Sequence, residues 1–156
     1  MSSFATRNFG WTVALLGALG TAQPLHAQLE IGTWVRKAAT SGPAMTMKIE
    51  ACCNGGRRLS YRTTVNGKAT VLVLETRLDG KEAPVLMDGK PSGETMAITR
   101  VDAHHATNVL KLNGTQFGTS KATLSADGKT LTVENDFNSA SGGQPVGKTT
   151  EVWVKQ

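Results

Sequence analysis

The chain is poor in cysteine, in aromatic residues and in long hydrophobic runs, and these shortages exclude several classes of protein. Two cysteines in 156 residues exclude a small domain held together by many disulfides. The seventeen glycines follow no three-residue period, which excludes collagen. Hydrophobic residues make up 39% and charged residues 19%, close to an ordinary globular protein. Length and composition therefore predict one folded domain.

The sequence also lacks the short motifs that mark common catalytic and cofactor sites. Neither Gly-x-Ser-x-Gly nor His-Glu-x-x-His occurs, and no glycine pattern for phosphate or dinucleotide binding is present. The net charge of +5 is mild and spread along the chain, whereas nucleic-acid binders typically carry a basic cluster or stripe. We therefore expect no enzymatic activity, no cofactor and no nucleic-acid partner.

The first 27 residues have the layout of a secretory signal peptide. Arg7 precedes residues 9–20, which are mostly apolar or glycine, and a polar stretch ends at Ala27. The apolar run is shorter than the roughly 20 residues that a membrane-spanning helix needs. We expect bacterial export to the periplasm or the medium, with cleavage after Ala27, or alternatively after Ala22. The mature chain, 28–156, has no second apolar run, and we expect no membrane span in it.

Turn dipeptides divide the mature chain at short intervals. Asn-Gly and Asp-Gly pairs suit type I′ hairpin turns, and they begin at Asn54, Asn66, Asp79, Asp88, Asn113 and Asp127. Between them, apolar and polar residues alternate with the period of a β-strand. The pattern predicts strands near 30–37, 44–52, 57–65, 69–78, 82–87, 93–101, 106–112, 116–125, 129–137 and 147–155.

Short connections between consecutive strands favour an up-and-down antiparallel meander. Closing such a meander into a barrel removes both exposed sheet edges. We predict an all-β domain over residues 28–156, an up-and-down barrel of 8–10 strands, with an open two-sheet sandwich as the alternative. Trp34 and Trp153 are then structural residues that close the barrel base where the first and last strands meet.

Gly32-Thr33-Trp34, in the first predicted strand, resembles the Gly-x-Trp opening of the calycin superfamily, which includes lipocalins and fatty-acid-binding proteins. Further segments, in order along the chain, resemble small exported bacterial proteins with a lipocalin-like fold and no assigned activity. These segments are Leu78–Val85, Ile98–Asp102, Leu124–Val133 and Val152–Lys155. The resemblance implies a calycin-like barrel, and it implies little about function because one fold serves many functions.

The chain departs from the calycin families at three places. Residues 38–43 leave room only for a loop where fatty-acid-binding proteins place a helix pair. The last predicted strand, 147–155, lacks the Arg and Tyr of their carboxylate clamp. Lys155 is the only residue available where lipocalins commonly stack an arginine on the Gly-x-Trp indole. The resemblance therefore does not extend to a fatty-acid clamp or to a standard lipocalin base.

Arg100 is the first candidate for a ligand contact. It continues the alternating face of Met96 and Ile98, and if that face points inward the guanidinium would hold an anionic group in the lumen. The other interpretation is a strand-end cation that reaches water. Tyr61 and Arg62 are weaker candidates for orienting the same ligand.

We predict a secreted, non-catalytic protein that binds a small, partly apolar ligand in the barrel lumen. The alternative is a filled barrel that acts as an envelope or interaction module without a ligand.

The adjacent cysteines, Cys52 and Cys53, leave several outcomes open: inert thiols, a disulfide between neighbours, or a disulfide-linked dimer. A bond between neighbours requires the Asn54-Gly55-Gly56 turn to have begun, since strand side chains alternate between faces. With Met45 and Met47 the cysteines form a soft-ligand set that suits Cu(I), although methionines commonly fill apolar cores. A copper or redox role is therefore a minor alternative.

Asp102, His104 and His105 form the other polar cluster of the sequence. Adjacent histidines on an extended strand point apart, and no spaced partner motif for a structural zinc site appears. We predict a solvated turn there and no metal site.

Overall fold

The computed structural model describes residues 30–37, 44–65, 67–140 and 145–156. The predicted signal peptide and the predicted loop at 38–43 lie outside these residues. The described chain forms ten strands, β1 (Gly32–Arg36), β2 (Thr46–Cys52), β3 (Gly56–Val65), β4 (Lys68–Thr76), β5 (Asp79–Met87), β6 (Lys90–Arg100), β7 (His105–Leu112), β8 (Thr115–Leu124), β9 (Thr130–Phe137) and β10 (Gly147–Lys155). Each strand corresponds to one that the sequence pattern predicts.

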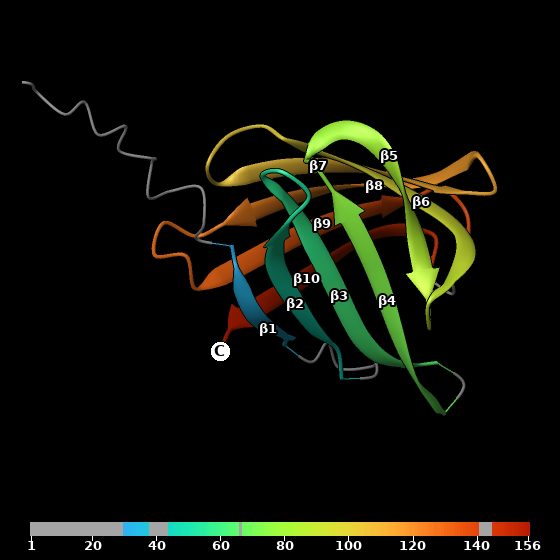
Figure 1. Cartoon of the computed structure of the whole chain (residues 1–156), viewed down its shortest axis with the longest axis horizontal. Coiled ribbons are helices and arrows are strands. Elements are labelled where there is room, and N and C mark those ends of the chain that lie inside the picture. The colour runs from blue at the N-terminus through green and yellow to red at the C-terminus, as the bar shows by residue number, and fades with distance from the viewer. Residues whose placement is uncertain (1–29, 38–43, 66, 141–144) are drawn as a thin grey trace, which may run out of the picture.

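The ten strands close into a single antiparallel barrel (Figure 1). Every strand pairs with its neighbours in sequence, and β1 closes the ring by pairing with β10. The up-and-down barrel is therefore confirmed, and the open sandwich is wrong because the two terminal strands hydrogen-bond to each other. Within the described part of the chain, no helix is long and apolar enough to cross a membrane.

Hairpin turns connect several of the strands at the predicted dipeptides. Asn113 and Gly114 have φ angles of 49° and 82°, and Asp88 and Gly89 have φ angles of 49° and 79°. Both central residues of a type I′ turn require a positive φ, which explains why glycine follows Asn or Asp at each turn. These turns keep consecutive strands adjacent and so produce the meander.

The main hydrophobic core lies at the junction of the first and last strands. Trp34 is completely buried and Trp153 is 2% exposed, and both belong to one cluster with Met47, Ile49, Leu59, Leu74, Val85 and Leu124. The paired strands bring the two indoles together, because Trp153 lies opposite Arg36 and Trp34 lies opposite Lys155. The two tryptophans thus occupy the structural positions that the sequence predicts for them.

A second, smaller cluster lies toward the other end of the barrel. Leu110, Phe117 and Phe137 are buried there, and the two phenyl rings stack with centroids 6.2 Å apart. Gly118 pairs with Phe137, and a Cβ at Gly118 would come within 2.7 Å of the Phe137 ring. The close approach of this ring to the backbone therefore depends on a glycine at this position.

Packing is uneven around the barrel wall. Three of the nine residues of β4 are buried, whereas none of the eleven residues of β6 is. The inward-facing side chains of β6, including Met96 and Ile98, keep part of their surface accessible. The inner face of β6 is therefore less completely buried than the inner face of β4.

Candidate ligand-binding site

The strand register divides the side chains into an inner and an outer set. Trp34, Met47, Tyr61 and Leu72 lie opposite one another in a row on β1–β4, and the buried members of that row fix the inner face. Because side chains alternate along a strand, the inner set on every other strand follows from the pairing. We call the barrel end that holds the end of β6 the base, and the end that holds its beginning the rim.

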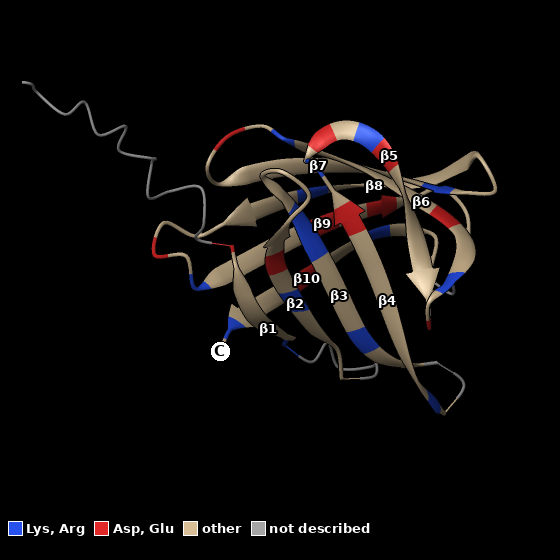
Figure 2. Cartoon of the chain, viewed as in Figure 1, with Lys and Arg blue, Asp and Glu red and all other residues tan. Residues whose placement is uncertain are grey.

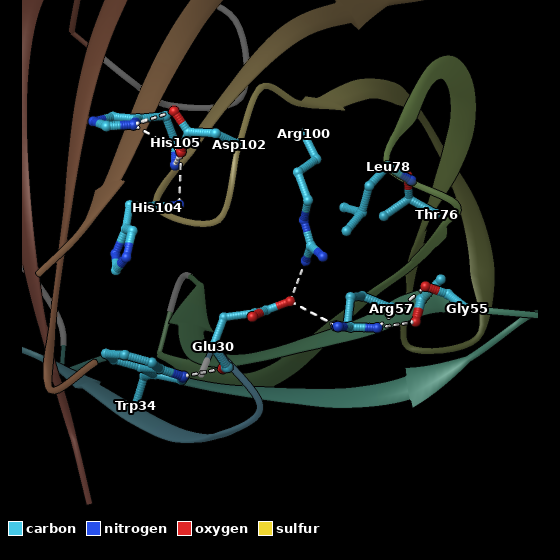
Figure 3. Close-up of polar contacts among 11 residues, drawn as sticks. Glu30, Trp34, Gly55, Arg57, Thr76, Leu78, Arg100, Asp102, His104 and His105 are labelled. Carbon is cyan, nitrogen blue, oxygen red and sulfur yellow. Dashed lines mark hydrogen bonds and ion pairs between the residues drawn. The ribbon is translucent and has the colours of Figure 1, made fainter. Parts of the chain in front are cut away.

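The base contains a cluster of three charged side chains, Glu30, Arg57 and Arg100 (Figure 3). Arg57 donates to Glu30 Oε1 from Nε at 2.9 Å and contacts it from Nη2 at 2.8 Å, and Arg100 Nη2 binds the same oxygen. Arg57 also donates from Nη1 to the carbonyls of Gly55 and Gly56. This cluster joins residue 30 to β3 and β6 and occupies the inside of the base.

These contacts determine what Arg100 can do. Its side chain is on the inner face, as the sequence pattern allows, and Figure 3 shows it pointing from β6 toward Glu30. The strand-end interpretation, a cation that simply reaches water, does not describe this geometry. Its guanidinium already has an internal carboxylate as partner, and the Arg100 side chain is 31% exposed. The acid that neutralises it, Glu30, carries no signal in the sequence pattern beyond its place before the first strand.

Lys155 lies at the same end of the barrel. Its ammonium group is 5.7 Å from the centroid of the Trp34 ring, a cation–π geometry. Lysine thus takes the place that the calycin resemblance gives to an arginine. The Trp34 Nε1–H donates to the Glu30 carbonyl at 2.8 Å, which ties the indole to the charged cluster.

Between the two hydrophobic clusters, a row of neutral polar side chains crosses the inner face. Asn108 lies opposite Ser120, Ser120 opposite Asn135, and Asn135 opposite Thr149, on the adjacent strands β7 to β10. All four residues are half-buried, and Asn135 Nδ2 donates to Thr149 Oγ1 at 3.4 Å. We call this set the polar row. It gives the lumen hydrogen-bonding groups midway between the base and the rim.

Asn108 is the member of the polar row that points most directly to a ligand. Its Oδ1 atom is buried and has no hydrogen-bond partner within the described structure. Leaving a buried acceptor unpaired costs about 1–3 kcal/mol, and native proteins usually satisfy such atoms with water, an ion or a ligand. Oδ1 therefore marks a place where a hydrogen-bond donor is expected.

Tyr61 and an ion pair lie on the inner face near Trp153. Arg36 Nη1 is 3.0 Å from Glu151 Oε1, and the Trp153 Nε1–H donates to Glu151 Oε2 at 3.2 Å. The Tyr61 ring meets Trp153 edge to face with centroids 6.1 Å apart. Burial, and secondarily the charge of Glu151, raise the pKa of the Tyr61 phenol far above its usual value. The phenol therefore stays neutral and can donate or accept a hydrogen bond.

Arg62 does not share this position. It is exposed on the outer face of β3, with its side chain directed away from Tyr61, because consecutive strand residues point to opposite sides. From this position Arg62 does not face the lumen, so the prediction that it orients a lumen ligand is wrong. Arg62 instead lines a surface depression of about 260 Å³ together with Thr33, Thr46, Met47, Lys48 and Ser60.

Glu94 is an inward-facing carboxylate near the rim. It lies opposite Leu112 on β7, next to the second hydrophobic cluster. Burial raises the pKa of its carboxyl group, and no ion pair to it occurs within the described ranges. Strand alternation could have placed Glu94 on the Met96 face, but its isolation from basic groups depends on the three-dimensional arrangement.

The cysteines form a disulfide with each other. Cys53 and Asn54 have φ angles of 53° and 54°, so the turn that this bond requires has begun at Cys53. Since each sulfur is bonded to its neighbour, an intermolecular disulfide would require this bond to open. The predicted soft-ligand set is not assembled, because Met45 and Met47 face the core while the cysteines lie in a bond at the strand end.

The Asp102 segment is a hydrogen-bonded turn, as predicted. Asp102 Oδ1 accepts the backbone N–H groups of His104 at 2.7 Å and His105 at 2.8 Å, and these bonds together with the His105 side chain lower the Asp102 pKa. His104 points away from His105, with its Nδ1 3.1 Å from the Leu124 carbonyl. Within the described residues, no group of three His, Cys, Asp or Glu side chains could hold a metal ion.

Charged residues of both signs are spread over the strands rather than concentrated on one of them (Figure 2). On the outer surface they form local pairs such as Lys48 with Glu50 and Arg58 with Glu75. Exposed pairs of this kind contribute little to stability. The outer surface thus presents mixed charge, and the concentration of buried charge is inside the base.

The fold places this protein in the class of closed up-and-down antiparallel β-barrels with an amphipathic interior. Two solved structures with the same fold are those of the fluorescent protein UnaG. An asparagine-to-alanine mutant of UnaG superposes with a TM-score of 0.57 at 11% identity, covering 83% of this chain and 97% of that one. Wild-type UnaG superposes with a TM-score of 0.54 at 12% identity, covering 81% and 96%. No family model and no curated protein matches the sequence.

Proposed function

We propose that this protein is a non-catalytic carrier or receptor that binds a small, partly apolar molecule inside its barrel. The observation that carries the proposal is the buried Asn108 Oδ1, an acceptor without a partner on the inner wall. The incomplete burial of β6 supports it, since a barrel filled by its own side chains would bury the inner face of every strand. The alternative of a filled interaction module explains neither feature.

The composition of the inner wall supports a ligand that is apolar over most of its surface. Met96, Leu110 and Phe137 lie on the rim side of the polar row, and Leu131 and Val133 lie on its base side. Small-molecule sites typically combine mostly apolar walls with a few polar groups that orient the ligand. Tyr61 remains a candidate for one of these polar contacts. The likeness to UnaG supports the barrel and leaves the ligand open.

Tryptophan fluorescence with a neutral apolar probe tests this function. Trp34 and Trp153 are the only tryptophans in residues 28–156, so titration with N-phenyl-1-naphthylamine reports directly on the barrel. We expect saturable quenching of tryptophan emission and an increase in probe emission. Native mass spectrometry of the purified protein should show one bound probe molecule.

A matched pair of substitutions separates lumen binding from surface binding. Ala122 faces inward opposite Val133, and the next residue, Thr123, faces outward and is exposed. Ala122→Phe should fill the lumen and abolish probe binding, while Thr123→Phe should leave it unchanged. Equal binding by both variants, or no saturable binding by the parent protein, would contradict the proposed function.

We further propose that the protein acts after export, with residues 1–27 removed. The support is the sequence layout alone: one cation, an apolar run and a polar stretch ending in Ala27. Expression of the whole chain in a Gram-negative host, followed by fractionation and intact mass measurement, tests this. We expect a periplasmic product that begins at Gln28 and carries one internal disulfide. A full-length cytoplasmic product would contradict export.

A further inference from the structure

Between the base and the polar row, the cations of the inner wall already have partners. Arg57 and Arg100 bind Glu30, Arg36 binds Glu151, and Lys155 covers the Trp34 ring. The internal segments outside the described residues, 38–43, 66 and 141–144, contain no ionisable residue. A negatively charged ligand group in this region would therefore have to break an internal pair to obtain a cationic partner.

The polar row itself carries no charge. Its groups are two carboxamides and two hydroxyls, and its buried unpaired atom is an acceptor, Asn108 Oδ1. An acceptor is satisfied by an N–H or O–H donor and repels a carboxylate. Toward the rim on β6, the next ionisable group of the inner face is Glu94, an acid without an ion-pair partner in the described ranges.

We propose that the lumen selects ligands whose polar group is a neutral N–H or O–H donor, such as an amide or an alcohol, over ligands that carry a carboxylate. Asn108 Oδ1 receives the donor, and the apolar part of the ligand lies against the two hydrophobic clusters on either side of the polar row. This inference rests on the proposed lumen binding and adds the chemical class of the ligand.

The selectivity has a direct energetic basis. A site built to hydrogen-bond a donor discriminates strongly against a group that cannot donate, because its own buried acceptor then stays unpaired. A carboxylate brought beside Asn108 Oδ1 would also lose its hydration without gaining a cation. Both effects disfavour the same ligand, so the preference for the neutral donor should exceed that expected from one hydrogen bond alone.

Displacement of bound N-phenyl-1-naphthylamine by two ligands with the same hydrocarbon chain measures this preference. Decanamide and decanoate differ only in the polar group, and at pH 7.4 only decanoate is charged. We expect decanamide to displace the probe at a concentration at least about tenfold lower than decanoate. Equal potency, or a preference for decanoate, would overturn the inference, and the latter would indicate that an anion replaces Glu30 at the base.

Two substitutions at Asn108 test its role in opposite directions. Asn108→Leu should reduce decanamide affinity about tenfold and leave decanoate nearly unchanged. Asn108→Lys should reverse the order so that decanoate binds better, a gain that misfolding cannot produce. Thr119→Val, on the exposed outer face beside Ser120, is the control and should change neither ligand. An unchanged amide-to-carboxylate ratio in both Asn108 variants would also overturn the inference.

The same experiment separates failure of this inference from failure of the proposed function. If the unmodified protein does not bind the probe, lumen binding itself is wrong and the inference falls with it. If the probe binds and is displaced equally by both ligands, lumen binding stands and only the proposed selectivity is wrong.

Discussion

The two ends of the barrel interior each hold a carboxylate, and the two carboxylates are in opposite situations. At the base, Glu30 is held by two guanidinium groups, one of them on a side chain only 7% exposed. Near the rim, Glu94 lies among apolar side chains, where burial raises its pKa and no basic group of the described residues pairs with it. Glu30 thus has two arginine partners at the base, whereas Glu94 has no ion-pair partner among the described residues.

This difference separates structural polar groups from groups that are available to a ligand. A buried charge with a complete set of partners holds the surrounding chain in place. Removing one of those partners strongly destabilises the folded protein. A buried polar group without partners lowers the stability of the empty protein and becomes favourable when a ligand supplies the missing interaction. By this criterion the charged groups of the base have a structural role. The wall from the polar row to the rim is the proposed binding region.

The largest effect is expected from removing the carboxylate at the base. Glu30→Gln removes the carboxylate that the buried Arg57 binds, and loss of one partner from a buried ion pair typically destabilises by about 3 kcal/mol. Urea unfolding followed by far-ultraviolet circular dichroism measures this change. The matched control is Glu75→Gln, because Glu75 pairs with Arg58 where both side chains are about half exposed.

The control should lose less than about 1 kcal/mol, as exposed ion pairs generally do. Equal losses for the two variants would show that the base cluster is no more than a surface pair. If Glu30→Gln instead strengthened decanoate binding with little loss of stability, the base would be a ligand site and the comparison would be reversed.

A smaller loss is expected at the rim, where packing rather than charge gives the wall its shape. Gly118→Ala places a methyl group 2.7 Å from the Phe137 ring and 3.2 Å from the Asp136 carbonyl. Overpacking of this kind typically costs about 1–3 kcal/mol. A double-mutant cycle with Phe137→Leu measures the coupling, since the smaller side chain should relieve most of the cost. Additive losses would show that the glycine is not required by the ring.

The fold was predictable from the sequence because it depends on local signals that repeat. Six Asn-Gly or Asp-Gly pairs divide the chain, and the alternation between them has the period of a strand. Gly32-Thr33-Trp34 indicated the first strand and carried the resemblance to the calycin superfamily. Ring closure followed from avoiding exposed edges, and the pairing of Trp34 with Lys155 and of Arg36 with Trp153 bears it out.

The site was predictable only in part, because its groups come from strands that are distant in sequence. Alternation groups Arg100 with Met96 and Ile98 but does not reveal that residue 30 neutralises Arg100. The polar row depends on the register of four strands, which brings Asn108 beside Ser120. The strand period puts Arg62 on the face opposite Tyr61, so alternation alone argues against a place for Arg62 in the lumen.

The smallest effect, and the one of opposite sign, is expected from Glu94. Its pKa in the folded protein is raised above the ordinary value of 4.5, so the folded state binds this proton more tightly than the unfolded chain does. Stability should therefore fall as the pH rises from about 4.5 through the folded-state pKa, and the penalty is fully present above it. Glu94→Gln removes the charge, and we expect a modestly higher melting temperature at pH 7.5 and none of this pH dependence.

The matched control is Glu82→Gln on the neighbouring strand. Hydrogen bonds from Lys111 and Thr95 lower the pKa of Glu82, so its contribution to stability has the opposite sign and is lost as the pH falls. At pH 4 the Glu94→Gln variant and the parent should melt at similar temperatures, because the parent carboxyl is then protonated. A Glu94→Gln variant that melts lower than the parent at pH 7.5 would show that Glu94 has a partner, and the contrast between base and rim would no longer hold.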